Sequence, residues 1–225
     1  MNTSLHIDFI SDVACPWCAV GLHGLDEALR RIGDDIDIRL RFQPFELNPD
    51  MPPEGDDTLA YLARKYGMAE PQIRQNQQTL HERGAAVGFR FGERSRVWNT
   101  FDAHRLLQWA AAVDDETGAD HQARLKHALL QAYHGDGENP SDPDVLLRLA
   151  GDAGLDVLAA REVLNSDAWA DPVRAAESQW QQAGIRAVPS VVVNGRHLIQ
   201  GGQPPEAYEQ ALRQIAAAGD ASASA

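Results

Sequence analysis

The sequence predicts an α/β protein in which one sheet is interrupted along the chain by a large all-helical insertion. Three observations support this fold class: a strand–helix–strand pattern over the first 50 residues, helical signals alone from about residue 56 to 184, and strand signals that return before a final helix. The length of 225 residues suits one large domain, or a smaller one with a sizeable insertion. We therefore expect residues 1–50 and 172–218 to form the sheet domain, residues 51–171 an inserted helical domain, and residues 219–225 a disordered tail.

The N-terminal segment carries the strand–helix–strand pattern. An apolar run at residues 4–10 predicts a buried strand, and apolar side chains spaced by three and four predict an amphipathic helix at 16–32. Gly33 offers a helix stop, and alternation of apolar and charged side chains over 36–42 predicts a half-buried strand. Two strands joined through a helix are normally parallel with a right-handed crossover. A cluster of prolines then marks a boundary near residue 50.

The middle of the chain shows helical periodicity only. Asp57 or Thr58 is suited to cap the first helix, and glycines or prolines bound several of the others. Residues 88–92, two phenylalanines and an arginine between glycines, are expected to form a short extended loop. The predicted helices span residues 58–67, 71–83, 97–111, 123–133, 143–152, 157–164 and 172–183.

The strand signal returns near the C-terminus. Two short apolar runs, 190–193 and 197–199, flank Asn194-Gly195, a pair that accepts the positive φ angles of a tight hairpin. Two glycines then break the chain before a predicted helix at 204–217.

The two cysteines of the chain, Cys15 and Cys18, stand three residues apart at the opening of the first helix. The apolar stripe of that helix places Cys18 on its buried face, whereas Cys15 meets the unpaired N–H groups and positive dipole of the helix N-terminus, which favour a thiolate. Pro16 suits the first turn, where a missing N–H costs nothing. We therefore expect one exposed, activated sulfur with a buried one behind it, an arrangement typical of dithiol exchange.

Three other interpretations of the cysteine pair are weaker. Structural zinc needs four ligands; His23 continues a zinc-knuckle spacing, but Ala28 occupies the position of the last ligand. A structural disulfide across three residues closes almost no loop and stabilises little. The third interpretation is that both cysteines are incidental small apolar residues.

Composition excludes several classes of partner. The net charge of −13 disfavours non-specific binding to nucleic acid and to anionic membranes. No segment approaches the apolar length of a membrane span, and the first residues lack the basic and apolar regions of a secretory signal. We therefore expect a soluble cytoplasmic protein, in which a lone C-x-x-C is more often catalytic than structural.

Five segments match the motifs of one known family. They are Asp12-Val13-Ala14-Cys15-Pro16-Trp17-Cys18, Phe42-Gln43-Pro44-Phe45-Glu46-Leu47-Asn48-Pro49, Asn99-Thr100-Phe101-Asp102-Ala103-His104-Arg105-Leu106, Ala187-Val188-Pro189-Ser190 and Gly201-Gly202-Gln203-Pro204. With these segments the chain resembles the DsbA family of thiol–disulfide oxidoreductases, and within it the FrnE-like branch often labelled polyketide-biosynthesis dithiol–disulfide isomerases. The resemblance extends to about residue 217 and implies a thioredoxin fold, with residues 1–50 and 172–218 as the thioredoxin-like domain.

The resemblance also implies roles for individual residues. Cys15 and Cys18 are the catalytic pair, and Pro189 is a cis-proline that faces them. Val188 offers its backbone to an extended substrate as an edge strand does. Pro16 and Trp17 complete the expected substrate-binding set, although Trp17 is equally suited to packing under the insertion.

The expected activity is disulfide exchange with protein or small-molecule thiols and disulfides, glutathione among the candidates, and no cofactor or metal is implied. Periplasmic DsbA has a histidine where this chain has Trp17, so we expect a less stabilised thiolate and a more reducing couple. His104 and Asn99 are candidates to line the cleft, but a buried, hydrogen-bonded structural role fits His104 better.

Two rival functions use the same scaffold. Kappa-class glutathione transferases and 2-hydroxychromene-2-carboxylate isomerases resemble this architecture but carry a lone serine in place of Cys15, so the presence of both cysteines favours dithiol chemistry. The second rival is a chaperone whose helical insertion holds unfolded clients. The physiological substrate, the direction of electron flow and the oligomeric state stay open.

Overall fold

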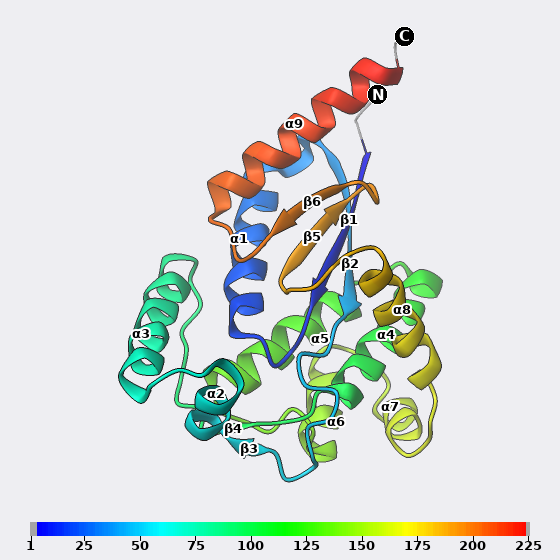
Figure 1. Cartoon of the computed structure of the whole chain (residues 1–225). Coiled ribbons are helices and arrows are strands. Elements are labelled where there is room, and N and C mark those ends of the chain that lie inside the picture. The colour runs from blue at the N-terminus through cyan, green and yellow to red at the C-terminus, as the bar shows by residue number, and fades with distance from the viewer. Residues whose placement is uncertain (1–3, 224–225) are drawn as a thin grey trace.

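The computed structural model describes residues 4–223, with side chains through residue 219 (Figure 1). Within this range the main sheet has four strands in the order β2-β1-β5-β6. Strand β1 is parallel to β2 and antiparallel to β5, and β6 is antiparallel to β5. The predicted parallel pair is therefore confirmed, and the sheet joins the two ends of the chain. The strands are β1 (Ser4–Ser11), β2 (Asp37–Pro44), β5 (Ser190–Val193) and β6 (His197–Gln200).

Helices α1 (Pro16–Ile32) and α9 (Pro205–Ala223) pack together against one face of the sheet (Figure 1). Because side chains alternate along a strand, Leu5, Ile7 and Phe9 of β1 all point into this layer, and each is buried. The predicted bounds of α1 are those observed, and Gly33 ends it with a positive φ of 54°.

The opposite face carries helix α8 (Ala170–Gln182). Its Trp180 packs with Ile10, Phe45 and Val192 in a smaller apolar cluster. Helix α8 contacts β2, as do α4 (Phe101–Thr117) and α5 (His121–Leu130), so the helical segment is built onto the sheet (Figure 1).

Helices α4 and α5, with α6 (Pro143–Asp152) and α7 (Val157–Leu164), form a second apolar core, which Val13 and Ala14 of the β1–α1 loop enter. The cysteine-bearing loop therefore lies where the two cores meet. The stretch of chain between β2 and β5 also contains α2 (Thr58–Tyr66) and α3 (Glu70–Ala86), which lie outside this second core. The thioredoxin fold with a helical insertion is thus confirmed, and the domain boundaries at residues 50 and 171 stay predictions.

Four details differ from the sequence-based expectations. Val97 belongs to a two-residue strand, β4 (Arg96–Val97), paired with β3 (Asp56–Asp57), where helices alone were expected. Helix α3 continues through Gly84, and α5 passes into a π-helical turn at Gln131–Gly135. Helix α9 runs to Ala223, so residues 219–223 are helical and not a disordered tail, and residues 224–225 lie outside the described range.

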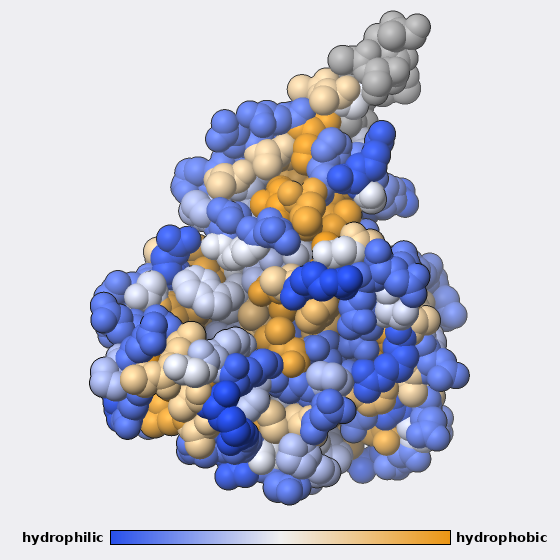
Figure 2. Space-filling model, in the orientation of Figure 1, coloured by the Kyte–Doolittle hydropathy of each residue, from blue (hydrophilic) through white to orange (hydrophobic). Residues whose placement is uncertain are grey.

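The remaining elements agree closely. Asp57 caps α2, accepting from the Ala60 N–H at 2.9 Å, and the Asn194-Gly195 hairpin turn has the expected positive φ angles of 53° and 65°. Along residues 4–223, no helix combines the length and apolar character that a membrane crossing requires. The face of the molecule shown in Figure 2 is mostly hydrophilic, with smaller apolar patches.

Candidate functional site

Cys15 is the N-cap residue of α1, and Pro16 occupies the first turn. The loop before it is held by Asp12, whose backbone carbonyl accepts from the Cys15 N–H at 3.2 Å and whose Oδ1 accepts from the Ala14 N–H at 3.0 Å. The Cys15 carbonyl in turn accepts from the Cys18 N–H at 3.0 Å. The nucleophile candidate therefore stands at the positive end of the helix dipole on a loop that is tightly turned.

Both cysteines are free thiols, and both are buried. Cys18 is fully buried, as its place on the apolar stripe predicts, but Cys15 is only 5% exposed, so the expectation of an exposed sulfur is wrong. The cover comes from residues distant in sequence: the Cys15 Sγ lies 3.5 Å from the carbonyl oxygen of Val188, and side chains of α2 and α3 surround the adjoining cavity. Cys15 is reached through that cavity and not from an open surface.

The Val188–Pro189 peptide bond is cis, as predicted, and Val188 presents its carbonyl to Cys15. Helix α1 approaches this loop closely because residue 21 is glycine: a Cβ there would lie 2.9 Å from Pro189 Cγ. Pro189 itself is buried and leads into β5.

A buried carboxylate, Asp12, ties three parts of the fold to the cysteine loop. Besides the Ala14 N–H, Oδ1 accepts from Thr100 Oγ1 at 2.7 Å and lies 3.3 Å from His104 Nε2, while Oδ2 accepts from the Leu47 N–H at 2.6 Å. Burial raises the pKa of Asp12, but these hydrogen bonds and the nearby His104 outweigh burial, and the net pKa is lowered. Asp12 is therefore an ionised anchor under the loop.

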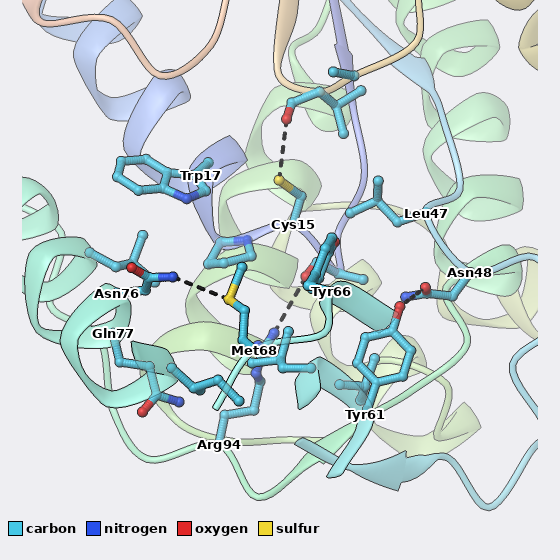
Figure 3. Close-up of a pocket in the computed structure, with 18 of the residues that line it drawn as sticks. Cys15, Trp17, Leu47, Asn48, Tyr61, Tyr66, Met68, Asn76, Gln77 and Arg94 are labelled. Atoms are coloured by element: carbon cyan, nitrogen blue, oxygen red, sulfur yellow. Dashed lines mark hydrogen bonds between the residues drawn. The ribbon is translucent and has the colours of Figure 1, made fainter. Parts of the chain in front are cut away.

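Beside Cys15 the structure contains a cavity of about 480 Å³ (Figure 3). Its walls come from the cysteine motif, from α2 and α3, and from the loop that carries Val188. Trp17 and Tyr66 lie at this site and are 37% and 51% exposed, which is unusual for large aromatic side chains. Most of the remaining lining is apolar, and its polar members include Asn48, Tyr61, Asn76, Gln77, Arg94 and Arg186.

Arg94 is half-buried and connects the cavity to the cysteine loop. Its Nη1 donates to the Ala14 carbonyl at 3.4 Å and to His134 Nδ1 at 3.4 Å, and His134 Nε2 donates to the Val13 carbonyl at 2.8 Å. Burial first, and Arg94 second, hold the pKa of His134 well below its usual value, so this histidine is neutral. The guanidinium also stacks over the Tyr133 ring, 4.9 Å from its centroid.

The surroundings of Cys18 disfavour its thiolate form. Burial, then the hydrogen bond and charge of neighbouring Cys15, raise the pKa of Cys18 well above its ordinary value. Lys126 of α5 is also fully buried; desolvation lowers its pKa, and electrostatic interactions with the acidic groups of Cys18, Asp12 and Cys15 act against that lowering. Such buried ionisable groups at one place are typical of functional sites.

The residues predicted for the site come together: Cys15, Pro16, Trp17 and Val188 all line the cavity, while Cys18 and Pro189 lie behind them. His104 is buried on Asp12, the structural role that was favoured for it. Asn99 does not line the cavity.

Sequence reasoning missed Arg94, Lys126 and His134, and it assigned Asp12 no role. Asp12 had one usable signal, because it directly follows an apolar strand and precedes the cysteine motif. Among the residues that the structure describes with side chains, no group of three or more His, Cys, Asp or Glu could hold a metal ion.

Comparisons with known proteins agree with this geometry. The family model described as a DSBA-like thioredoxin domain matches residues 6–213. A crystal structure of a probable DsbA oxidoreductase from Streptomyces coelicolor is 33% identical, with a TM-score of 0.84 over 93% of this chain and 89% of that one.

Two more distant structures are similar in fold. A 2-hydroxychromene-2-carboxylate isomerase has a TM-score of 0.70 at 15% identity, over 93% of this chain and 95% of that one. The cytosolic disulfide reductase DsbM from Pseudomonas aeruginosa, also solved with GSH, has a TM-score of 0.61 at 19% identity, over 93% of this chain and 98% of that one.

Proposed function

The chain belongs to the DSBA-like thioredoxin domain family, and from that premise we propose that it exchanges thiols and disulfides through Cys15 and Cys18. The observation that carries the proposal is the position of Cys15, at the N-terminus of α1, beside a cavity and 3.5 Å from the Val188 carbonyl. Cys18 lies one turn further along and is fully buried, where no substrate reaches it directly.

The exchange proceeds in two steps. The Cys15 thiolate attacks one sulfur of a substrate disulfide, forms a mixed disulfide and releases the other sulfur as a thiolate, which takes up a proton. Cys18 then loses its proton and attacks the Cys15 sulfur, which expels the second substrate thiol and leaves Cys15 and Cys18 joined. Two electrons move from the protein dithiol to the substrate, and the reverse sequence oxidises a substrate dithiol.

In this proposal the residues beside Cys15 position the substrate. Val188 offers backbone groups to an extended substrate, Pro189 contributes no N–H donor, and Trp17 adds exposed apolar surface. Glutathione is a candidate small-molecule partner, because DsbM shares the fold and has been solved with GSH. A cytoplasmic location stays a prediction from the sequence.

Two variants test the proposal in single-turnover reactions with 2-hydroxyethyl disulfide. The reduced wild-type protein should become an intramolecular disulfide and release two equivalents of thiol. Cys18→Ser should stop at the mixed disulfide on Cys15, and Cys15→Ser should not react; intact and peptide mass spectrometry distinguish these products. A Cys15→Ser variant that reacts as fast as the wild-type protein would refute the assignment.

The rival functions predict a different pattern. An isomerase that uses glutathione, or a chaperone that holds clients, should keep its activity in the Cys15→Ser, Cys18→Ser double variant. Retention of turnover on 2-hydroxychromene-2-carboxylate, or of client protection, in that double variant would favour the rival over dithiol exchange.

A further inference from the structure

The charges that line the cavity differ from those of the whole protein. The chain has 33 acidic residues and a net charge of −13, yet no aspartate or glutamate lines the cavity beside Cys15. The charged residues in its wall are Arg94 and Arg186. A neutral or cationic substrate would need no such arrangement, whereas an anionic one would.

Arg94 is the better placed of the two arginines. Figure 3 shows its side chain pointing toward the Cys15 end of the cavity, and its Nη1 is anchored on the carbonyl of Ala14, the residue before Cys15. Over the described range of the chain, no carboxylate forms an ion pair with Arg94, although several exposed arginines have such partners. The charge of Arg94 lowers the pKa of His134 and opposes the rise in the pKa of Tyr61 and of Tyr133. Because Tyr61 lines the cavity, the electrostatic effect of Arg94 extends to the cavity wall.

Among the neighbouring polar groups, Asn48 adds a donor suited to a carboxylate. Burial raises the pKa of Tyr61 to about 12, so this phenol stays protonated, and its hydroxyl donates to the Asn48 side-chain oxygen. The Asn48 oxygen also accepts from Lys65 at 2.6 Å, so the amide is oriented and its NH₂ group stays available as a donor. The cavity, about 480 Å³, is within the range of small-molecule sites, roughly 300–1,000 Å³.

We propose that this cavity selects small disulfides and thiols that carry a carboxylate, with Arg94 as the residue that binds the carboxylate while Cys15 attacks the sulfur. A planar guanidinium matches a carboxylate with two parallel hydrogen bonds, and the partly buried site strengthens them. The inference rests on the dithiol exchange proposed above and uses the same two steps and electron balance. Arg94 takes no part in bond making; it sets which substrate is bound.

The test compares three disulfides of similar size: 3,3′-dithiodipropionate (anionic), 2-hydroxyethyl disulfide (neutral) and cystamine (cationic). Single-turnover oxidation of the reduced protein is followed by thiol release, and each rate is divided by the rate at which dithiothreitol reduces the same disulfide. We expect the wild-type protein to prefer the anionic over the neutral disulfide by roughly tenfold, the value of one charge-assisted contact. The preference should weaken as ionic strength rises.

Arg94→Gln should abolish the preference. Arg94→Lys should keep part of it, because lysine retains the charge but not the planar group that donates two parallel hydrogen bonds. Since the preference is a ratio within one variant, a general loss of Cys15 reactivity cancels. Arg161→Gln makes the same charge change at an exposed position of α7 that does not line the cavity, and it should leave the ratio as in the wild-type protein.

Two failures are distinguishable. If no disulfide oxidises the protein faster than the Cys15→Ser blank, dithiol exchange itself is wrong. If all three oxidise it without preference for the anion, or if Arg94→Gln keeps the full preference, exchange stands and the carboxylate site is refuted. Should Arg94→Gln fail to fold, the wild-type ratio and its salt dependence decide the question alone. Oxidation of the reduced protein at equal rates by an unfolded protein that carries a disulfide and by the anionic disulfide would also count against a small-molecule site.

Discussion

Replacing Asp12 by asparagine should destabilise the protein and loosen the cysteine loop. The carboxylate accepts from the Ala14 N–H, the Leu47 N–H and Thr100 Oγ1, and it lies beside His104, so it joins the loop to the segment that follows β2 and to the start of α4. Asparagine keeps the shape but loses the charge and turns one acceptor oxygen into a donor that faces other donors.

The size of the effect follows from these contacts. Hydrogen bonds to a charged group contribute about 1.5–3 kcal/mol each, and a buried unpaired donor costs about 1–3 kcal/mol, so we expect a loss of about 3 kcal/mol. In a protein of this length that loss lowers Tm by roughly 6–12 °C. Urea unfolding and thermal melts at pH 7 measure both quantities.

Asp8→Asn, in the strand β1 that leads to Asp12, is the matched control. Asp8 is half-buried, accepts one hydrogen bond from Gln43 Nε2 at 2.7 Å, and has a pKa that burial raises. Its ionised form is therefore disfavoured in the fold, and removal of its charge should cost less than about 1 kcal/mol.

The pH dependence gives an independent check with a definite sign. Because the folded pKa of Asp12 is lowered, the stability that it contributes is fully present above the unfolded value of about 3.9 and is lost as pH falls through the folded pKa. The gap between wild-type protein and Asp12→Asn should stay constant from pH 7 to 5 and shrink below about pH 4. A gap under 1 kcal/mol at pH 7, or one that persists undiminished in acid, would refute the role of Asp12 as an ionised anchor.

Three further outcomes are expected. Because the pKa of Cys18 is raised, resolution of a mixed disulfide on Cys15 should accelerate with pH between 6 and 9, and a flat stopped-flow profile would contradict a buried resolving thiol. Gly24→Ala should cost about 1–3 kcal/mol in urea unfolding, since a Cβ there would lie 2.6 Å from the Gln203 carbonyl; an unchanged midpoint would show that the loop before α9 moves away from α1 at little cost. Because Trp17 supplies no positive charge, the couple should be more reducing than about −120 mV in glutathione buffers, and a potential as oxidising as that of DsbA would show that residues outside the motif set it.

The ends of the chain were predictable because their signals are local. Periodicity located β1, α1 and β2, and Asn194-Gly195 located the hairpin, since each depends on residues within one element. Val97 shows the limit: its spacing from Phe101 mimics a helix face, but its backbone pairs with Asp56, a partner 41 residues away.

The site was predictable only in part for the same reason. The C-P-W-C motif is contiguous, so its place on α1 followed from the sequence. Asp12 and Thr100 are 88 residues apart, Cys15 and Val188 are 173 apart, and Arg94 reaches the loop across 80 residues. No local pattern encodes such pairs, and the burial of Cys15 was missed because its cover comes from these distant segments.

Competitive alkylation tests the central claim, that Cys15 attacks and Cys18 resolves, most directly. Reduced protein is treated near neutral pH with less than one equivalent of iodoacetamide, and the modified cysteine is identified by peptide mass spectrometry. Cys15 lines the cavity and stands at a helix N-terminus, whereas Cys18 is fully buried with a raised pKa, so the label should be found on Cys15. Preferential labelling of Cys18 would contradict the assignment and reverse the roles of the two thiols.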